Sequence, residues 1–433
     1  MIIEFKFENA YSFRNETVFS MLTAPIKERL FTDAGNYHAI NDKLTALNTS
    51  AIYGANASGK SNFIKALSFF RNLVFESPRF VEALDINIQS FALDAECMNK
   101  PSTFEILFWW KEKLYRYGFS ISRKAIEKEW LFVKEKRESE VFSREKQTFQ
   151  INPKYKILAD LRDKNMIHTK ALLLSVASTY NDEHSKNVIE WLLRLNVISG
   201  VNDSLYRNFT IEQMRSPEKA KKIIDLIKLA DFGIEDLRVL KQEAQGVKVT
   251  LGGTVDSSQI VNDKITVNEI FSKRYVKNNK GEFVLADFPF AAFESEGTQK
   301  FAHIAGPFIH TLEEGQILVI DELDTKLHPD LTERLVALFQ NKELNPKNAQ
   351  LIFTTHNANL MSARLLRRDQ IWFTEKDGFG TSKLYSLADF KREGKKARND
   401  EDIEKNYSLG RYGAVPFMGN FDNLLEQGGW EEK

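Results

Sequence analysis

The stretch LNTSAIYGANASGKSNF, residues 47–63, decides the fold of this chain. It opens with an apolar strand, and residues 62–75 then place apolar side chains at helical spacing. Between strand and helix lies GANASGKS, which fits the phosphate-loop pattern G-x-x-x-x-G-K-[ST]. The order of strand, glycine-containing loop and helix predicts an α/β fold built around a phosphate site.

The residue types of this loop match the needs of a bound phosphate. Gly54 and Gly59 let backbone N–H groups turn inward around an anion. Lys60 supplies positive charge to the β/γ-phosphates, and the Ser61 hydroxyl is a candidate Mg²⁺ ligand. The predicted helix directs the positive end of its dipole at the same anion. The other candidate nucleotide-binding residues of the loop are Asn56, Ser58 and Asn62.

A second motif, ILVIDE at 317–322, joins four apolar residues to two acids. A buried parallel strand delivers its last residues to the sheet edge where ligands bind in α/β proteins. Asp321 is therefore a candidate Mg²⁺ ligand, and Glu322 is a candidate general base for an attacking water. His356 follows the apolar stretch LIFTT and is either a structural histidine or a hydrogen-bond donor beside the γ-phosphate.

The motif SEGTQ, residues 295–299, leads into an apolar helical run. Read alone it is a helix N-terminus that Ser295 caps and Gly297 opens. Alternatively, its N–H groups and Ser295 bind the γ-phosphate of an ATP that a second subunit holds. Asp324 lies in a following loop, where it either reaches across a dimer interface or is a solvated acid.

The rest of the chain divides into an α/β pattern and an intervening part with a different pattern of strands and helices. Two strands are expected within the first 25 residues, and the pattern from 316 onward alternates strands with helices. The intervening strands are predicted at 102–110, 113–122, 125–136 and within 236–283, with turns at 252–253 and 279–281, and the helices at 170–179, 187–195 and 217–230. The predicted domains are 1–76 and 284–390 for a nucleotide-binding head, 77–283 for an inserted lobe and 391–433 for a charged tail.

Composition narrows the possible class of protein. The 433 residues carry 60 Lys and Arg against 60 Asp and Glu, which argues against a surface that is basic throughout. A single cysteine, Cys97, excludes an intrachain disulfide and fits a reducing compartment. No secretory signal or membrane-length apolar run occurs, so a cytoplasmic location and no membrane partner are expected. The 33 Phe are interpreted as core residues.

The order of these motifs resembles that of ABC-type ATPase heads of the RecF, SMC-like and OLD group. GANASGKSN resembles the G-x-N-x-x-G-K-S-N form of that group, with Ala57 in place of a frequent Gly. SEGTQ departs from the familiar LSGGQ signature and resembles the form of a bacterial subfamily linked to abortive infection and phage defence. The tail at 399–416 resembles the C-terminal signature of the same subfamily. The implied fold is an ABC-type P-loop NTPase head, a mixed sheet with flanking helices, carrying an inserted α+β lobe.

The resemblance also implies an Mg²⁺-dependent ATPase in which two heads enclose two ATP molecules. Ser295, Gly297, Thr298 and Gln299 would then serve the nucleotide of the other subunit, and Asp324 would lie in the dimer loop. A glutamine that contacts the metal is expected after the first helix, and Gln89 is the tentative candidate, although a surface role is at least as good an explanation. The implied assembly is a homodimer or a higher homo-oligomer.

Two functions remain open at this point. The first is an ATPase that regulates a separate effector, a nuclease or toxin, because only 77 residues follow His356, too few for the toprim nuclease of OLD proteins. The second is a RecF-like ATPase that binds DNA for repair or end sensing. It requires a basic track, for which the candidates are Arg215, Lys219, Lys221, Lys222 and 391–398. An ABC transporter subunit is disfavoured by the long insertion.

Overall fold

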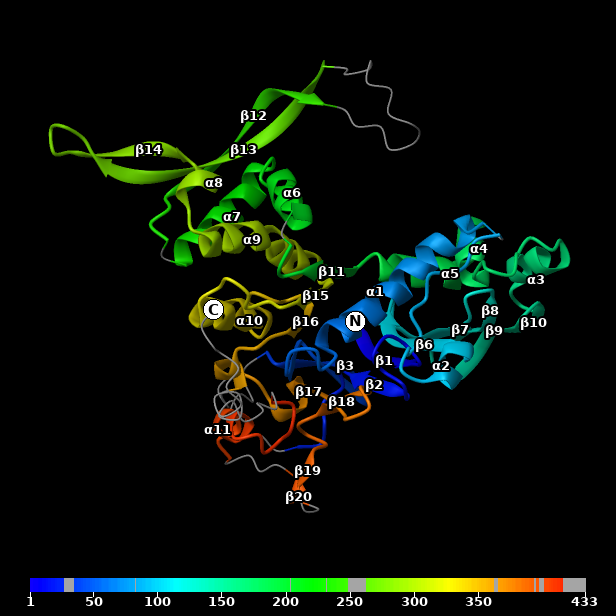
Figure 1. Cartoon of the computed structure of the whole chain (residues 1–433). Coiled ribbons are helices and arrows are strands. Elements are labelled where there is room, and N and C mark those ends of the chain that lie inside the picture. Colours follow the sequence, from blue (N-terminus) through cyan, green and yellow to red (C-terminus); the bar gives the residue numbers. More distant parts are fainter. Residues whose placement is uncertain are drawn as a thin grey trace, which may run out of the picture. The chain divides into compact units, whose positions relative to one another are not determined.

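The structure, a computed structural model, describes residues 1–26, 35–81, 83–202, 204–230, 232–247, 262–361, 365–392, 395–396 and 401–415. Their contacts divide the chain into two compact units, and Figure 1 labels most of their elements. The first unit contains Met1–Gly200, Leu312–Asp324 and Glu333–Lys433, and the second contains Val201–Thr311 and Thr325–Thr332. The second unit is thus an insertion in the sequence of the first.

The predicted parallel strands form one six-stranded sheet in the first unit, ordered β11-β15-β16-β5-β17-β18. The first five strands run parallel, and β18 pairs antiparallel with β17. Their bounds are Leu195–Ser199 (β11), Ile317–Asp321 (β15), Gln350–Thr354 (β16), Thr49–Gly54 (β5), Ile371–Lys376 (β17) and Ser382–Ser386 (β18). Strands β5, β15, β16 and β17 confirm the strands that the sequence pattern predicts at 47–53, 316–321, 350–355 and 370–375. Strand β11 was not predicted, and it begins at the last residue of a stretch predicted to be helical.

A second sheet of the first unit is antiparallel and has seven strands, ordered β10-β9-β8-β7-β6-β1-β2. Their bounds are Thr148–Ile151 (β10), Glu138–Glu145 (β9), Ile126–Lys134 (β8), Lys113–Ile121 (β7), Ser102–Trp110 (β6), Ile2–Glu8 (β1) and Thr17–Ser20 (β2). The strands predicted at 102–110, 113–122 and 125–136 are confirmed.

The pairing of β6 with β1 moves a predicted domain boundary. Residues 102–151 belong to the same sheet as the N-terminal strands, so they form part of the first unit rather than part of an insertion that begins at residue 77. The inserted unit instead starts at Val201 and runs to Thr311. The physical reason is that a two-stranded ribbon of β1 and β2 alone would be only marginally stable. Strand β6 pairs with β1 on the side opposite β2 and extends the sheet.

The helix α1, Lys60–Glu76, packs against the antiparallel sheet through phenylalanine side chains. The ring centres of Phe63 and Phe70 lie 6.2 and 5.9 Å from that of Phe5 on β1. On β7 of the same sheet, Phe119 stacks with Phe70 at 5.1 Å. The interpretation of the phenylalanines as core residues therefore holds for this layer, which joins the antiparallel sheet to the phosphate-loop helix.

A buried glutamine adds a polar connection between the two sheets. Gln350, on β16, accepts a hydrogen bond from the N–H of Ile2 through Oε1 at 2.7 Å. Its Nε2 donates to the carbonyl oxygens of Ile2 and Leu47, at 3.1 and 3.0 Å. Both ends of the amide are satisfied, so its burial carries little cost.

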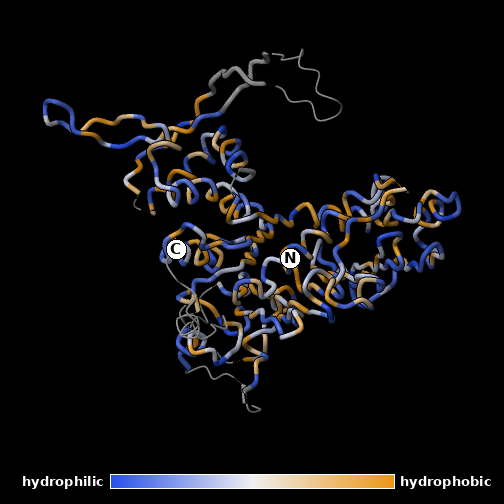
Figure 2. Tube along the Cα trace, viewed as in Figure 1, coloured by the Kyte–Doolittle hydropathy of each residue, from blue (hydrophilic) through white to orange (hydrophobic). Residues whose placement is uncertain are grey.

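The second unit contains helices and a three-stranded antiparallel sheet, ordered β12-β13-β14. The bounds are Ser204–Gln213 (α6), Pro217–Leu229 (α7), Asp236–Val247 (β12), Asn262–Lys277 (β13), Phe283–Pro289 (β14) and Phe290–Phe293 (α8). The predicted helix at 217–230 and turn at 279–281 are confirmed, while the turn predicted at 252–253 lies outside the described residues. Strand β14 is hydrophobic along much of its length (Figure 2).

The remaining elements complete the description. Helices α9 (Glu296–Glu314) and α10 (Pro329–Phe339) each contain residues of both units. The other helices and hairpin strands are η1 (Ser77–Arg79), α2 (Ala95–Asn99), α3 (Lys156–Asp163), α4 (Leu173–Thr179), α5 (Glu183–Leu192), η2 (Ala358–Met361), η3 (Arg368–Gln370), α11 (Ile403–Ser408), β3 (Tyr37–Asn41), β4 (Leu44–Leu47), β19 (Lys391–Arg392) and β20 (Lys395–Lys396). Within the described ranges, no helix is long and apolar enough to cross a membrane.

Candidate functional site

The phosphate loop connects β5 to α1, as the sequence predicts. Lys60 is the first residue of α1, so the N-terminal end of the helix faces the loop. Its Nζ donates to the carbonyl oxygens of Gly54 and Ala55, at 2.7 and 3.1 Å, which folds the side chain back over the loop. Ala57 and Gly59 have φ of 61° and 124°. Gly59 is required here because a Cβ at this position would lie 2.6 Å from the Ser382 hydroxyl.

Several residues that the sequence did not single out hold the loop in place. Ser58 shares a hydrogen bond of 2.6 Å with the Thr374 hydroxyl, and Thr374 also donates to the carbonyl of Tyr53 at 3.2 Å. Asn62 donates to the hydroxyl of Ser12 at 2.8 Å. Thr374 lies on β17, whose place beside β5 the sequence does not display, and no local signal pointed to Ser12.

The two acids of the second motif lie at the carboxyl end of β15, on the side of the sheet where β5 also ends. The Thr354 hydroxyl, on the neighbouring strand β16, donates to Asp321 Oδ1 at 2.7 Å. The Thr354 hydroxyl oxygen also accepts a hydrogen bond from the backbone N–H of Glu322 at 2.7 Å. Glu322 has a φ of 58°, an uncommon value for a residue with a side chain. Thr354 therefore fixes both candidate residues through one atom.

A close backbone approach supports the same turn from the other neighbouring strand. The N–H of Gly200, which follows β11, donates to the carbonyl of Asp321 at 2.6 Å. A Cβ on Gly200 would lie 2.0 Å from the carbonyl oxygen of Glu322, so only glycine fits. Neither Gly200 nor strand β11 was predicted to take part in this site.

His356 lies in the loop after β16, together with the charged residues of the site. Its backbone N–H donates to Asp324 Oδ2 at 3.1 Å. Partial burial lowers the pKa of His356, and the nearby Lys60 ammonium lowers it further, so the ring is neutral at neutral pH. Burial likewise lowers the pKa of Lys60, against the opposing effect of the carboxylates of Glu322, Asp321 and Asp324. The structure thus brings Lys60, His356 and the three acids into one electrostatic cluster.

The SEGTQ motif lies in the second unit at the start of α9. Ser295 caps this helix as predicted, since its hydroxyl accepts the Thr298 N–H at 3.2 Å. Gln299 Nε2 donates to the Glu294 carbonyl at 2.8 Å. A Cβ on Gly297 would lie 2.6 Å from the carbonyl oxygen of Lys326. The motif is therefore a capped and tightly packed helix start, with Ser295 itself exposed.

Gln89 is exposed in the extended segment before α2. Its backbone carbonyl accepts the N–H of Tyr11 at 2.7 Å. Among the described residues, no hydrogen bond joins its side chain to Ser61 or Asp321. A metal-binding role for Gln89 stays a prediction.

The donor set of the site fits ATP together with Mg²⁺. The loop offers backbone N–H groups and Lys60 for phosphate, while Ser61 and Asp321 supply the oxygen ligands that Mg²⁺ prefers. Within the described residues, no group of three or more His, Cys, Asp or Glu side chains could hold a metal alone.

Comparisons with known proteins agree with this chemistry. Residues 50–362 match the family described as "AAA domain, putative AbiEii toxin, Type IV TA system". No curated protein matched the chain. Together with the sheet order, the family match supports the predicted ABC-type P-loop NTPase fold.

The chain is also similar to several solved structures. They include an SMC head domain from Thermotoga maritima (16% identity, TM-score 0.41, covering 89% of this chain and 98% of that one). An SMC head bound to the C-winged helix domain of ScpA gives 14% identity and a TM-score of 0.44, with 89% and 97% covered. The recombination mediator protein RecF gives 12% identity and a TM-score of 0.30, covering 89% of this chain and 98% of that one. At such TM-scores, partners and ligands have to be argued from the residues of this chain.

Proposed function

The chain belongs to the AAA-domain family described as putative AbiEii toxin, Type IV TA system, and we propose that it is an Mg²⁺-dependent ATPase that regulates a separate effector, a nuclease or toxin, in bacterial phage defence or abortive infection. The observation that carries the ATPase assignment is the cluster at the edge of the parallel sheet. There Lys60 of the phosphate loop lies near enough to Asp321, Glu322 and His356 to interact with them electrostatically.

Each residue of this cluster has a chemical task in the proposal. Backbone N–H groups of the loop and Lys60 bind the β/γ-phosphates, with Asn56, Ser58 and Asn62 completing the loop. Ser61 and Asp321 hold Mg²⁺, which supplies charge neutralisation of the phosphates when bound. Glu322 accepts a proton from the attacking water as general base. Neutral His356 donates a hydrogen bond to the γ-phosphate.

The proposal includes a dimer in which each head completes the site of the other. Ser295 is exposed at a helix N-terminus, so it is accessible to a phosphate held by a second copy, with Gly297, Thr298 and Gln299 shaping the same turn. One oxygen of Asp324, Oδ1, is buried without a hydrogen-bond partner among the described residues. A group from the second head would satisfy it. Gln89 is retained as a tentative metal ligand.

The choice of a protein effector over DNA follows from the charges of the chain. Its net charge is zero, and two of the basic candidates in the second unit already pair with acids. Arg215 lies 2.7 Å from Glu212, and Lys222 lies 3.0 Å from Glu218. The basic run at 391–398 lies partly outside the described residues. A RecF-like role on DNA is therefore the second candidate, and the cytoplasm is the proposed location.

The hydrolysis proposal is tested with Glu322→Gln, which removes the base but keeps the shape. We expect turnover to fall by orders of magnitude while ATP binding persists. The matched control is Glu333→Gln, an exposed acid on α10, which should leave turnover unchanged. Normal turnover in Glu322→Gln would reject Glu322 as the base.

The dimer is tested in the same Glu322→Gln background by light scattering with and without ATP. We expect an ATP-dependent dimer that Ser295→Asp prevents, since Asp keeps the helix cap but repels phosphate. Ser295→Asn, a neutral cap, is the control and should still dimerise. Equal dimerisation of both variants would contradict binding in trans.

The two functional candidates separate in one assay. ATP turnover is measured with and without duplex DNA at two salt concentrations. A several-fold stimulation that weakens as salt increases would favour the DNA-binding candidate. If DNA does not stimulate turnover, and the toxicity of a co-expressed effector depends on Lys60, the regulatory candidate is favoured.

A further inference from the structure

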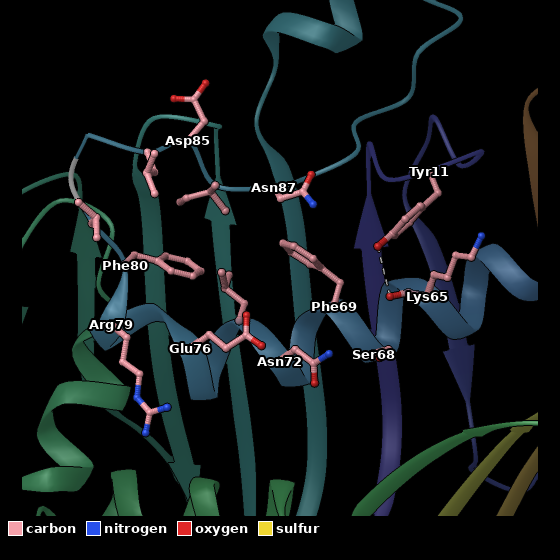
Figure 3. A pocket seen from close by; sticks show the side chains of 14 residues that line it. Tyr11, Lys65, Ser68, Phe69, Asn72, Glu76, Arg79, Phe80, Asp85 and Asn87 are labelled. Carbon is pink, nitrogen blue, oxygen red and sulfur yellow. Dashed lines mark hydrogen bonds between the residues drawn. The ribbon is translucent and has the colours of Figure 1, made fainter. Parts of the chain in front are cut away.

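A cavity of about 550 Å³ lies along the outer face of α1, within the first unit and beyond the phosphate loop (Figure 3). Its wall is formed by α1 from Lys65 to Glu76 and by residues 79–81 and 84–87, at the end of η1 and after it. This volume falls within the about 300–1,000 Å³ of typical small-molecule pockets. None of its lining residues has a task in the proposed ATPase chemistry.

Two aromatic rings face the cavity. Figure 3 shows Phe69, on α1, and Phe80, after η1, with their rings directed into the same space. Phe69 is held in place by Phe104, whose ring centre lies 5.4 Å away. Leu73 and Ile86, both buried, also line the cavity. The cavity therefore offers aromatic rings together with apolar side chains, a lining that suits a flat ring.

The segment that closes the cavity is held by the rest of the unit. The N–H of Ile86 donates to the carbonyl of Arg123 at 2.8 Å. The buried Lys170 donates through Nζ to the carbonyl of Leu84. The Tyr11 hydroxyl donates to the carbonyl of Lys65 at 3.5 Å. The wall is thus formed before any ligand arrives, which lowers the entropic cost of binding.

The charges around the cavity favour an anion. Asp85 pairs with Lys124 at 2.8 Å, so its charge is compensated. Within the described part of the chain, Lys65 and Arg79 at the two ends form no ion pair. Among the described residues that line the cavity, they leave two cations against one uncompensated acid, Glu76. Glu76 and Asn87 line the space between these ends and offer hydrogen-bond acceptors, and the Asn87 amide also donates.

We propose that this cavity binds a nucleoside monophosphate whose base carries an exocyclic amino group. The base lies between Phe69 and Phe80, its amino group donates to Glu76, and its phosphate meets Lys65 or Arg79 at the rim. The same chemistry is presented by a free nucleotide and by an unpaired nucleotide of a single strand. A basic peptide is the weaker candidate because the two rim cations repel it and one side chain underfills the cavity.

The test measures AMP binding to the full-length protein by titration calorimetry. AMP lacks the β/γ-phosphates that Lys60 would hold, so we expect one site per chain with the same affinity in Lys60→Ala. Loss of AMP binding in Lys60→Ala would place AMP in the phosphate loop and overturn the proposal. This readout is independent of turnover, so a failed ATPase assignment leaves it intact.

Variants locate the site and test its chemistry. We expect Phe80→Ala to weaken AMP binding by about tenfold or more, since stacking on one aromatic ring contributes on that order. Arg79→Ser removes one of the two rim cations and should also weaken AMP binding. The controls are Phe379→Ala and Arg137→Ser, both exposed elsewhere, which should bind AMP normally. ATP binding at the phosphate loop verifies that each variant is folded. Unchanged AMP affinity in both cavity variants would overturn the assignment.

Two further ligands complete the test. UMP, which has no amino group, should bind more weakly than AMP, and Glu76→Gln should reduce that difference. A short oligoadenylate distinguishes a strand from a free nucleotide, and binding of either supports the shared chemistry. Equal binding of UMP and AMP, or saturable binding of an arginine-containing peptide without AMP, would refute the proposal.

Discussion

Thr354 is the residue whose replacement most directly tests the geometry of the ATP site. Its hydroxyl donates to Asp321 and accepts from the N–H of Glu322, both at 2.7 Å, while the side chain is fully buried. Thr354→Val keeps the shape but removes both hydrogen bonds. A hydrogen bond to a charged group contributes about 1.5–3 kcal/mol. At about 1.36 kcal/mol for each tenfold change in rate, full loss of that orientation corresponds to a decrease of about 10- to 150-fold in kcat.

The assay compares kcat and the Mg²⁺ concentration for half-maximal turnover. We expect Thr354→Val to lower kcat within that range and to raise the Mg²⁺ requirement, because Asp321 loses the donor that orients it. Thr354→Ser keeps the oxygen and should restore both values. A purely structural role would not predict a change in Mg²⁺ requirement.

A matched control separates the site from general destabilisation. Thr49, on β5, is also fully buried, and its hydroxyl accepts from Gln340 and Gln370 at 2.9 and 2.6 Å. Thr49→Val should lower the free energy of unfolding but leave kcat per folded molecule unchanged. If Thr354→Val and Thr49→Val behave alike in kcat and Mg²⁺ requirement, the positioning role of Thr354 is wrong.

Three further perturbations have defined outcomes. Glu129→Gln should lower the free energy of unfolding by about 3–5 kcal/mol in a denaturant titration, since it leaves the buried Arg144 guanidinium, 3.7 Å away, without its counter-charge. Gly297→Ala should cost about 1–3 kcal/mol because its Cβ meets a carbonyl at 2.6 Å, whereas Gly378→Ala, with nothing within 4 Å, should be neutral. Burial lowers the pKa of His184 and His356 in the folded state, so the unfolded chain binds more protons as the pH falls below the ordinary value of 6.5. The stability that these groups contribute should be full above that pH and should fall as the pH decreases. A melting temperature that stays constant from pH 7 to 5 would contradict this.

The sequence predicted the parts of the site that are encoded locally. The loop from Gly54 to Ser61 and the acids Asp321 and Glu322 each combine a strand with the residues that immediately follow it, so their spacing alone shows them. Thr354 and Gly200 escaped prediction because their importance depends on which strands lie beside β15. Strand order is a non-local property that a single sequence does not display.

The same limit explains the misplaced boundary of the insertion. The sequence pattern changes near residue 77, and that change led to the prediction that residues 77–151 belong to a separate lobe. The phenylalanine layer shows why they belong together, since Phe70 contacts Phe5 on β1 and Phe119 on β7 at once.

This packing has a mechanical consequence for the phosphate loop. Helix α1 carries Lys60 and Ser61 at one end, and its phenylalanines contact the antiparallel sheet further along. The same sheet begins with β1 and β2, whose connecting loop supplies Ser12 to Asn62. The helix is therefore fixed at its first turn by hydrogen bonds and along its length by aromatic contacts. A displacement of the antiparallel sheet would move the residues that hold phosphate, which is the route by which a partner bound to that sheet would change ATP turnover.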